Sequence, residues 1–275
     1  MRVESPSLSF ARSSDGARIS YRTLGTGPGI LLVHGGVSSS NDLLPLARSL
    51  GGELTVHLID RRGRGRSDPQ GPDYSLETEY RDAAAVLAAT RSGCLFGHSF
   101  GALVALGTAP RAAVNKLVLY DSPLFIRPIV ERLLPRYHAA VAAGRYLDAY
   151  AAVVDALGVL HGVPTDAFVE HLRREIEPSD AWPEITRLLL AGERELDVGS
   201  RAPTGTEAYR SVLAETLLLV GGDSPAYIQQ SADLLMTALP NVTRVALVGQ
   251  GHTAALERPA EMARIVAGFC RAPRE

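Results

Sequence analysis

The stretch that decides the fold is Gly93–Gly107, which reads Gly-Cys-Leu-Phe-Gly-His-Ser-Phe-Gly-Ala-Leu-Val-Ala-Leu-Gly. Its first residues, Gly93–Gly97, form an apolar run of strand length, and Ser99–Ala109 has the small and apolar residues of a buried helix. Between them lies the pattern G-x-S-x-G, in which a sharp strand-to-helix turn exposes the serine hydroxyl. Its two glycines suit such a turn, because a side chain there would collide with neighbouring backbone. We therefore predict that Ser99 is a nucleophile at the N-terminus of a helix.

Strands alternate with helices outward from this stretch in both directions. The predicted strands are Leu8–Ala11, Arg18–Arg22, Gly29–Val33, Leu54–Ile59, Gly93–Gly97, Lys116–Tyr120, Thr216–Val220 and Val242–Val248. The predicted helices are Asn41–Leu50, Ser75–Thr90, Ser99–Ala109, Ala226–Leu239 and Leu256–Cys270, and Ser75 has the residue type of an N-cap. Because the strands are largely apolar, the pattern predicts an α/β fold with a mostly parallel, doubly wound sheet covered on both faces.

One long segment, residues 123–210, breaks the alternation, since it has helical segments and no strand pattern. We interpret it as a helical cap, inserted between the strand ending near 121 and the strand starting near 216. The core domain would then consist of residues 1–122 and 211–275. Apolar cap residues are expected to form a pocket, with Trp182 and several tyrosines near it. The candidates are Leu124, Phe125, Ile129, Leu133, Tyr137, Tyr146, Tyr150, Leu157, Phe168, Trp182 and Leu189.

The composition is that of an ordinary soluble globular protein. The 275 residues have a formal net charge of −2 and are 46% hydrophobic, which gives no electrostatic reason to expect nucleic acid or a membrane as partner. The two cysteines, Cys94 and Cys270, lie in apolar segments and read as packing residues. Met1–Phe10 lacks the apolar core of a signal peptide, and no apolar run has membrane-spanning length, so a cytoplasmic location is expected.

Three further motifs make the chain similar to the α/β-hydrolase family over nearly its whole length. His34-Gly35-Gly36 resembles the family's oxyanion loop, and residues 60–68, Asp-Arg-Arg-Gly-Arg-Gly-Arg-Ser-Asp, resemble its D-x-x-G-x-G-x-S segment. Gly249-Gln250-Gly251-His252 resembles the loop that presents the catalytic histidine after the last strand. The resemblance implies a triad in the order serine, acid, histidine.

The chemistry of such a site assigns a role to each part. A serine hydroxyl needs a base to remove its proton, and His252 can do this near neutral pH. The tetrahedral oxyanion needs preorganised donors, for which the resemblance implies the N–H groups of Gly36 and Phe100. His34 and His98 flank these positions and are interpreted as packing or pocket-lining residues. The arginines of residues 61–66 suggest a phosphate patch, but we interpret them as part of a loop whose shape is set by glycines.

Two aspartates compete for the role of the acid. The family usually places it in the pattern strand-G-x-x-D, but counting three residues on from Gly221 gives Ser224, and Asp223 lies one residue early. A second solution in the family puts the acid after the strand that follows the elbow helix, where Asp121 lies. We narrowly favour Asp121 because Asp223 departs from the usual spacing.

The leading hypothesis for function is a serine hydrolase of carboxylic ester or related acyl bonds. It would act on a small to medium, mainly apolar molecule through an acyl-enzyme, without metal or organic cofactor, and could form a homo-oligomer. The same triad could instead serve lactone, thioester or C–C bond cleavage, perhydrolysis or cyclisation, since fold and triad do not separate these reactions. A third hypothesis, a non-catalytic small-molecule receptor on this fold, is favoured only by the irregular acid loop.

Overall fold

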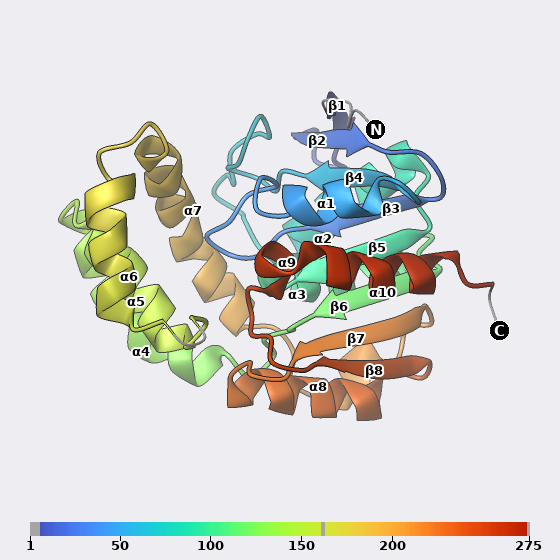
Figure 1. Ribbon diagram of the computed structural model, residues 1–275. Coiled ribbons are helices and arrows are strands. Elements are labelled where there is room, and N and C mark those ends of the chain that lie inside the picture. Colours follow the sequence, from blue (N-terminus) through green and yellow to red (C-terminus); the bar gives the residue numbers. More distant parts are fainter. Residues whose placement is uncertain (1–5, 161–162, 274–275) are drawn as a thin grey trace.

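The fold is built on one twisted eight-stranded sheet, described by a computed structural model that covers residues 6–160 and 163–273 (Figure 1). Its spatial order is β1-β2-β4-β3-β5-β6-β7-β8. β1 pairs with β2 and β2 with β4 in antiparallel fashion, and all other neighbours are parallel. The strands are β1 (Ser7–Arg12), β2 (Arg18–Leu24), β3 (Gly29–Val33), β4 (Thr55–Ile59), β5 (Cys94–His98), β6 (Lys116–Tyr120), β7 (Glu215–Gly221) and β8 (Val242–Leu247).

Helices cover both faces of the sheet, as the apolar strands predicted. α1 (Leu44–Leu50) and α10 (Pro259–Arg271), with the short α9 (Ala254–Glu257), pack on one face. α2 (Leu76–Thr90), α3 (Phe100–Thr108) and α8 (Ala226–Ala238) pack on the other, and the 3₁₀ turn η1 (Ala109–Arg111) follows α3. β3 shows the strand alternation behind this arrangement. Its Ile30 and Leu32 belong to the core under α1, whereas its Leu31 and Val33 belong to the core under α3.

The predicted core elements are all present. Strand bounds differ from the predicted ones by at most two residues, and the larger differences lie at helix ends. The helix expected from Asn41 begins at Leu44, and the helix expected from Leu256 is divided into α9 and α10. Prolines explain both, because Pro45 and Pro259 occupy first-turn positions, where a fixed φ and a missing N–H favour a helix start. Ser75 caps α2 as expected, since its side chain accepts a hydrogen bond from the N–H of Thr78.

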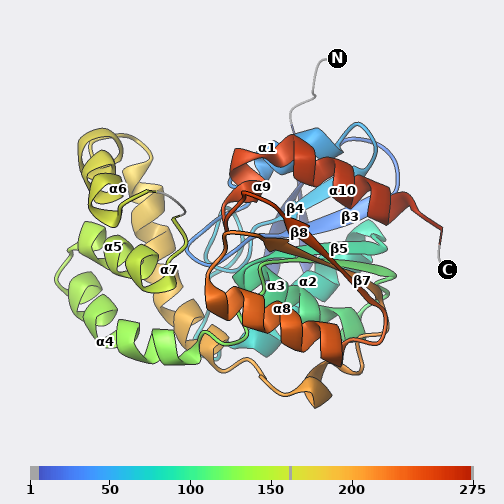
Figure 2. The same cartoon turned by 60° about the horizontal axis from the view of Figure 1, so that its bottom comes forward.

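The inserted segment lies at the carboxyl-terminal ends of the parallel strands, seen at the left of both views (Figures 1 and 2). Its described part holds helices and no strand. These are α4 (Arg127–Ala142), α5 (Tyr146–Leu157), α6 (Thr165–His171), the π-helical turn η2 (Leu172–Ile176), α7 (Trp182–Ser200) and the 3₁₀ turn η3 (Thr206–Tyr209). A small core of their own, which includes Val130, Leu133, Tyr137 and Leu189, holds these helices together. Residues 1–5, 161–162 and 274–275, which the predicted domain boundaries include, lie outside the described residues.

The cysteines differ from the prediction that they only pack. Cys94 at the start of β5 and Cys270 near the end of α10 form a disulfide, with their Cα atoms 6.2 Å apart. The sequence could not indicate this pairing, because 176 positions separate the two residues. Disulfides persist mainly in oxidising compartments, so the cytoplasmic location gains no support from this bond and stays a prediction. Among the described helices, none has the length and apolar character needed to span a membrane.

Candidate active site

Ser99 lies in the sharp turn between β5 and α3. Its φ of 54° and ψ of −123° are outside the ordinary regions for an L-residue, so the turn holds it under backbone strain. The surroundings require the predicted glycines. A Cβ on Gly97 would lie 2.3 Å from the carbonyl oxygen of Gly101, and one on Gly101 would lie 2.2 Å from that of Val33. The turn leaves Ser99 half-buried, on the wall of a cavity between the sheet and the cap.

His252 follows β8 and lines the same cavity. Its Nδ1 is 2.9 Å from Oδ2 of Asp121, which follows β6. Because an ionised carboxylate only accepts hydrogen bonds, Nδ1 carries a proton, and in the neutral ring Nε2 is then the nitrogen with the lone pair. That tautomer is the one a general base for Ser99 requires.

Asp121 is held from three sides. Besides His252, the hydroxyl of Ser224 donates to Oδ2 at 2.6 Å, and the N–H of Gly221 donates to Oδ1 at 3.0 Å. Burial alone would raise the pKa of Asp121, but the hydrogen bond and charge of His252, with the bonds from Ser224 and Gly221, outweigh it and lower the pKa. The carboxylate is therefore ionised at neutral pH, as a partner of a histidine base must be.

Asp223, the alternative acid, has an exposed side chain in the loop after β7, where its N–H donates to the carbonyl of Gln250. The neighbouring Ser224 occupies the position that the usual family spacing assigns to the acid, and its hydroxyl reaches Asp121. Of the two aspartates weighed in the sequence, Asp121 is thus the one that accepts the hydrogen bond of His252. At position 224 the chain therefore has a hydroxyl where the usual spacing places the acid, and this hydroxyl donates to the carboxylate of Asp121.

Gly36 and Phe100, the expected oxyanion donors, lie beside each other. A Cβ placed on Gly36 would be 3.7 Å from the Cβ of Phe100. Both residues line the cavity together with Ser99. Phe100 is the first residue of α3, where the backbone N–H groups and the helix dipole favour negative charge. The position of Gly36 opposite this helix end is compatible with two N–H donors to one oxygen atom.

The cavity encloses about 210 Å³, and its wall is mainly apolar. From the cap, Tyr150, Leu157 and Phe168 line it as expected. Leu133, Tyr137 and Leu189 pack inside the cap instead. The other candidates are not among the lining residues, namely Leu124, Phe125, Ile129, Tyr146 and Trp182. Sequence reasoning missed the lining residues Ile126, Val153, Val154, Val159, Leu160, Glu195 and Leu196. The missed residues on α5 and α7 face the cavity because of helix phase, which the apolar pattern did not reveal, whereas Ile126, Val159 and Leu160 lie outside the helices.

Two aromatic side chains hold the backbone at His252, namely His98, which lines the cavity in agreement with its sequence interpretation, and Tyr120. The ring of His98 stacks on that of Tyr120, with centroids 5.0 Å apart. Nε2 of His98 donates to the carbonyl of His252 at 2.9 Å, and the Tyr120 hydroxyl donates to the carbonyl of Gly251. Loss of hydration lowers the pKa of His98 to about 3, so its ring stays neutral beside His252. No motif marks Tyr120, which reads in the sequence as an ordinary strand residue.

The arginine-rich loop does not form a basic surface patch. Arg61, Arg62 and Arg64 are buried in ion pairs. Arg61 pairs with Glu79 of α2, and both Arg61 and Arg64 pair with Glu195 of the cap helix α7. The loop thus connects sheet, α2 and cap, in agreement with the interpretation that its arginines serve the structure.

Comparison with known proteins agrees with this fold. The model of the alpha/beta hydrolase family matches residues 30–265. The chain therefore belongs to the α/β-hydrolase family, which confirms the resemblance read from its motifs. A solved α/β hydrolase from Sphaerobacter thermophilus is similar at 32% identity and a TM-score of 0.79, with 95% of this chain and 99% of that chain covered.

Curated relatives carry hydrolase and esterase names. Esterase YbfF of Escherichia coli is 24% identical over 250 residues, which are 86% of this chain and 91% of that protein. The uncharacterized hydrolase YraK of Bacillus subtilis is 40% identical over 95 residues, which are 33% of this chain and 35% of that protein. These names, together with the family, support hydrolase activity for the chain.

Proposed function

We propose that this protein is a serine hydrolase that cleaves carboxylic esters or related acyl bonds of small to medium, mainly apolar molecules. The observation that carries the proposal is the strained Ser99 on the wall of an apolar cavity that it shares with His252, whose Nδ1 is held by Asp121. The esterase name of the Escherichia coli relative supports the same class of reaction.

The reaction begins when Oγ of Ser99 attacks the carbonyl carbon of the substrate. Its proton passes to Nε2 of His252, and the carbonyl electron pair moves onto the oxygen. The N–H groups of Gly36 and Phe100 stabilise this oxyanion, a contribution of about 3 kcal/mol for each donor. When the tetrahedral intermediate collapses, the ester C–O bond breaks and the leaving alcohol takes the proton from His252. Water then repeats the sequence on the acyl-enzyme and releases the carboxylic acid.

The cavity supports a small to medium substrate. Its 210 Å³ lie below the ~300–1,000 Å³ typical of sites for drug-sized ligands. The cap supplies aliphatic and aromatic side chains to the wall, and no cation is among the lining residues that the structure describes. An apolar acyl or alcohol group therefore fits the cavity better than an anionic one.

A fluorophosphonate probe, which reacts with activated serines, tests the proposal. We expect stoichiometric labelling of the wild-type protein and none of Ser99→Ala, because this substitution only removes a hydroxyl at the cavity wall. A series of p-nitrophenyl esters from acetate to decanoate should give the highest kcat/KM for short to medium chains. A folded wild-type protein that neither labels nor hydrolyses any of these esters would overturn the proposal and favour a receptor.

A further inference from the structure

The loop that carries Gly36 is anchored on both of its flanking peptide groups. Nη2 of Arg61 donates to the carbonyl oxygen of Gly35 at 2.6 Å. The N–H of Val37 donates to Oε2 of Glu195 at 3.2 Å. Val37 has a φ of 46°, which is unusual for a β-branched residue, so the loop needs external contacts to keep this conformation.

The geometry of the peptide bond makes the first contact directly relevant to Gly36. The carbonyl of Gly35 and the N–H of Gly36 belong to one planar trans peptide group and point in opposite directions. A donor that holds the carbonyl therefore sets the direction of the N–H. The guanidinium of Arg61 also polarises this peptide group, which makes the N–H a stronger donor.

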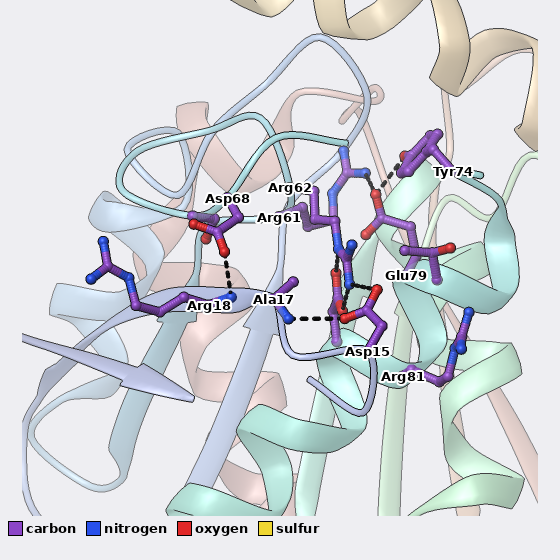
Figure 3. A network of polar contacts seen from close by, with 12 residues as sticks. Asp15, Ala17, Arg18, Arg61, Arg62, Asp68, Tyr74, Glu79 and Arg81 are labelled. Atoms are coloured by element: carbon purple, nitrogen blue, oxygen red, sulfur yellow. Dashed lines mark hydrogen bonds and ion pairs between the residues drawn. The ribbon is translucent and has the colours of Figure 1, made fainter. Parts of the chain in front are cut away.

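The holding groups form a buried cluster between core and cap. The side chains of Arg61, Arg64, Glu79 and Glu195 are each no more than 1% exposed. Nη1 of Arg61 is 2.9 Å from Glu79 and 2.5 Å from Glu195, and Glu195 also pairs with Arg64 at 2.5 Å. Figure 3 shows Arg61 directed toward Glu79 and Tyr74, while Arg62 turns to Asp15 on the other side.

Helix α7 of the cap docks closely on this loop. A Cβ on Gly192, one turn before Glu195, would lie 2.7 Å from Cγ2 of Val37. Gln70 donates to the carbonyl of Ala191, and Arg194 donates to that of Pro72. Glu195 thus lies on a helix that the core contacts in the turn just before it, at residues 191–194.

We propose that Arg61 and Glu195 are positioning residues for the reaction, which hold the Gly36 N–H in the direction that receives the oxyanion. The proposal rests on the proposed function, since it assumes that Gly36 is an oxyanion donor. Glu195 couples the cap to this donor, so α7 contributes to the catalytic step as well as to the cavity wall.

Positioning can be separated from simple electrostatics by charge counting. With all four groups ionised, the cluster is neutral, and Glu195→Gln leaves one positive charge in excess. An excess positive charge near the oxyanion would favour the transition state, so an electrostatic role predicts that kcat does not fall. A positioning role predicts that it falls, because the amide cannot hold both arginines and the N–H of Val37.

Arg61→Lys gives the charge-balanced test, because lysine keeps the charge but has no planar fork to hold the Gly35 carbonyl and both glutamates. Arg62→Lys is its matched control. Arg62 is the next residue, is 6% exposed, and pairs with Asp82 and Asp15 without a described contact to the loop. Circular dichroism and thermal melting identify the variants that are folded at the assay temperature.

For the best ester found in the wild type, we expect kcat to fall on the order of 10²-fold in Arg61→Lys and Glu195→Gln, with KM within about threefold. A boronic acid, which forms a tetrahedral adduct with serine, should lose affinity in parallel, while the product alcohol binds as before. A folded Arg61→Lys or Glu195→Gln with wild-type kcat would overturn the proposal, as would an equal loss in Arg62→Lys. If both test variants fail to fold, Arg64→Lys takes their place, because Arg64 pairs with Glu195. Weaker boronic acid binding by this variant would support the proposal, and unchanged affinity would overturn it. A folded wild-type protein that is inactive and not labelled would instead refute the proposed function, and the positioning role would fall with it.

Discussion

Among conservative substitutions, Asp121→Asn should cause the largest loss of kcat with the least change in side-chain shape. Oδ2 of Asp121 accepts from both His252 and Ser224, and Oδ1 accepts from Gly221. If the amide oxygen of asparagine stays on the Gly221 N–H, the amide NH₂ faces His252. The ring must then present an unprotonated Nδ1 and carry its proton on Nε2. In that tautomer it cannot accept the proton of Ser99.

The expected loss follows from that tautomer. We expect kcat to fall on the order of 10⁴-fold, which corresponds to about 5.4 kcal/mol of activation free energy. KM should change little, because Asp121 is not among the residues that line the cavity. The assay is ester hydrolysis at saturating substrate, with Ser99→Ala as the baseline for contaminating activity.

Asp223→Asn is the matched control, since its side chain is exposed and lies two residues from the Gly221 N–H that holds Asp121. It should retain kcat within about twofold, and circular dichroism should show that it is folded at the assay temperature. A folded Asp121→Asn variant within tenfold of wild type, or a crippled Asp223→Asn, would refute the assignment of the acid.

Acid pH should remove the stabilisation that Asp121 contributes, because its pKa is lower in the folded protein than the ordinary 3.8. A carboxyl of this kind stabilises the fold above its unfolded-state pKa and loses that contribution as pH falls. The wild type should therefore exceed Asp121→Asn in unfolding free energy by more above about pH 5 than below about pH 4. A difference that does not depend on pH in urea titrations would contradict this. Reduction of the Cys94–Cys270 disulfide, which closes a span of 176 positions, should lower the unfolding free energy by at most about 5 kcal/mol while hydrolysis persists. Differential scanning fluorimetry with and without dithiothreitol measures it, and identical melting temperatures would show that the bond adds nothing.

The sequence predicted the fold where short-range signals were strong. Apolar runs such as Gly29–Val33 and Lys116–Tyr120 could only be buried strands in this alternation, and the glycines of the elbow identified Ser99. The acid that contacts His252 could be narrowed to two candidates, Asp121 and Asp223, because each of them follows a strand that ends at the same edge of the sheet. The spacing of the loop favoured Asp121 only slightly. The structure explains why the loop departs from the usual pattern, because Ser224 donates a hydrogen bond to Asp121.

What the sequence could not predict depends on contacts between distant segments. Glu195 reads as one of several acids on an amphipathic helix, and only the docking of α7 brings it to Arg61, 134 positions away. The exclusion of Trp182 from the cavity likewise depends on how the cap helices are rotated about their axes. Neither local propensity nor a periodic apolar pattern contains that information.

Different cap helices contact different parts of the site, and this has a consequence for how such proteins diversify. α5 and α6 contribute Tyr150, Val153 and Phe168 to the cavity wall, and substitutions there change the shape of the cavity without changing the loop that carries Gly36. α7, in contrast, delivers Glu195 into that loop. Recombination that exchanges a whole cap between relatives would therefore have to preserve the pairing of α7 with the arginine loop. Drift confined to α5 and α6 can open new substrate ranges one residue at a time.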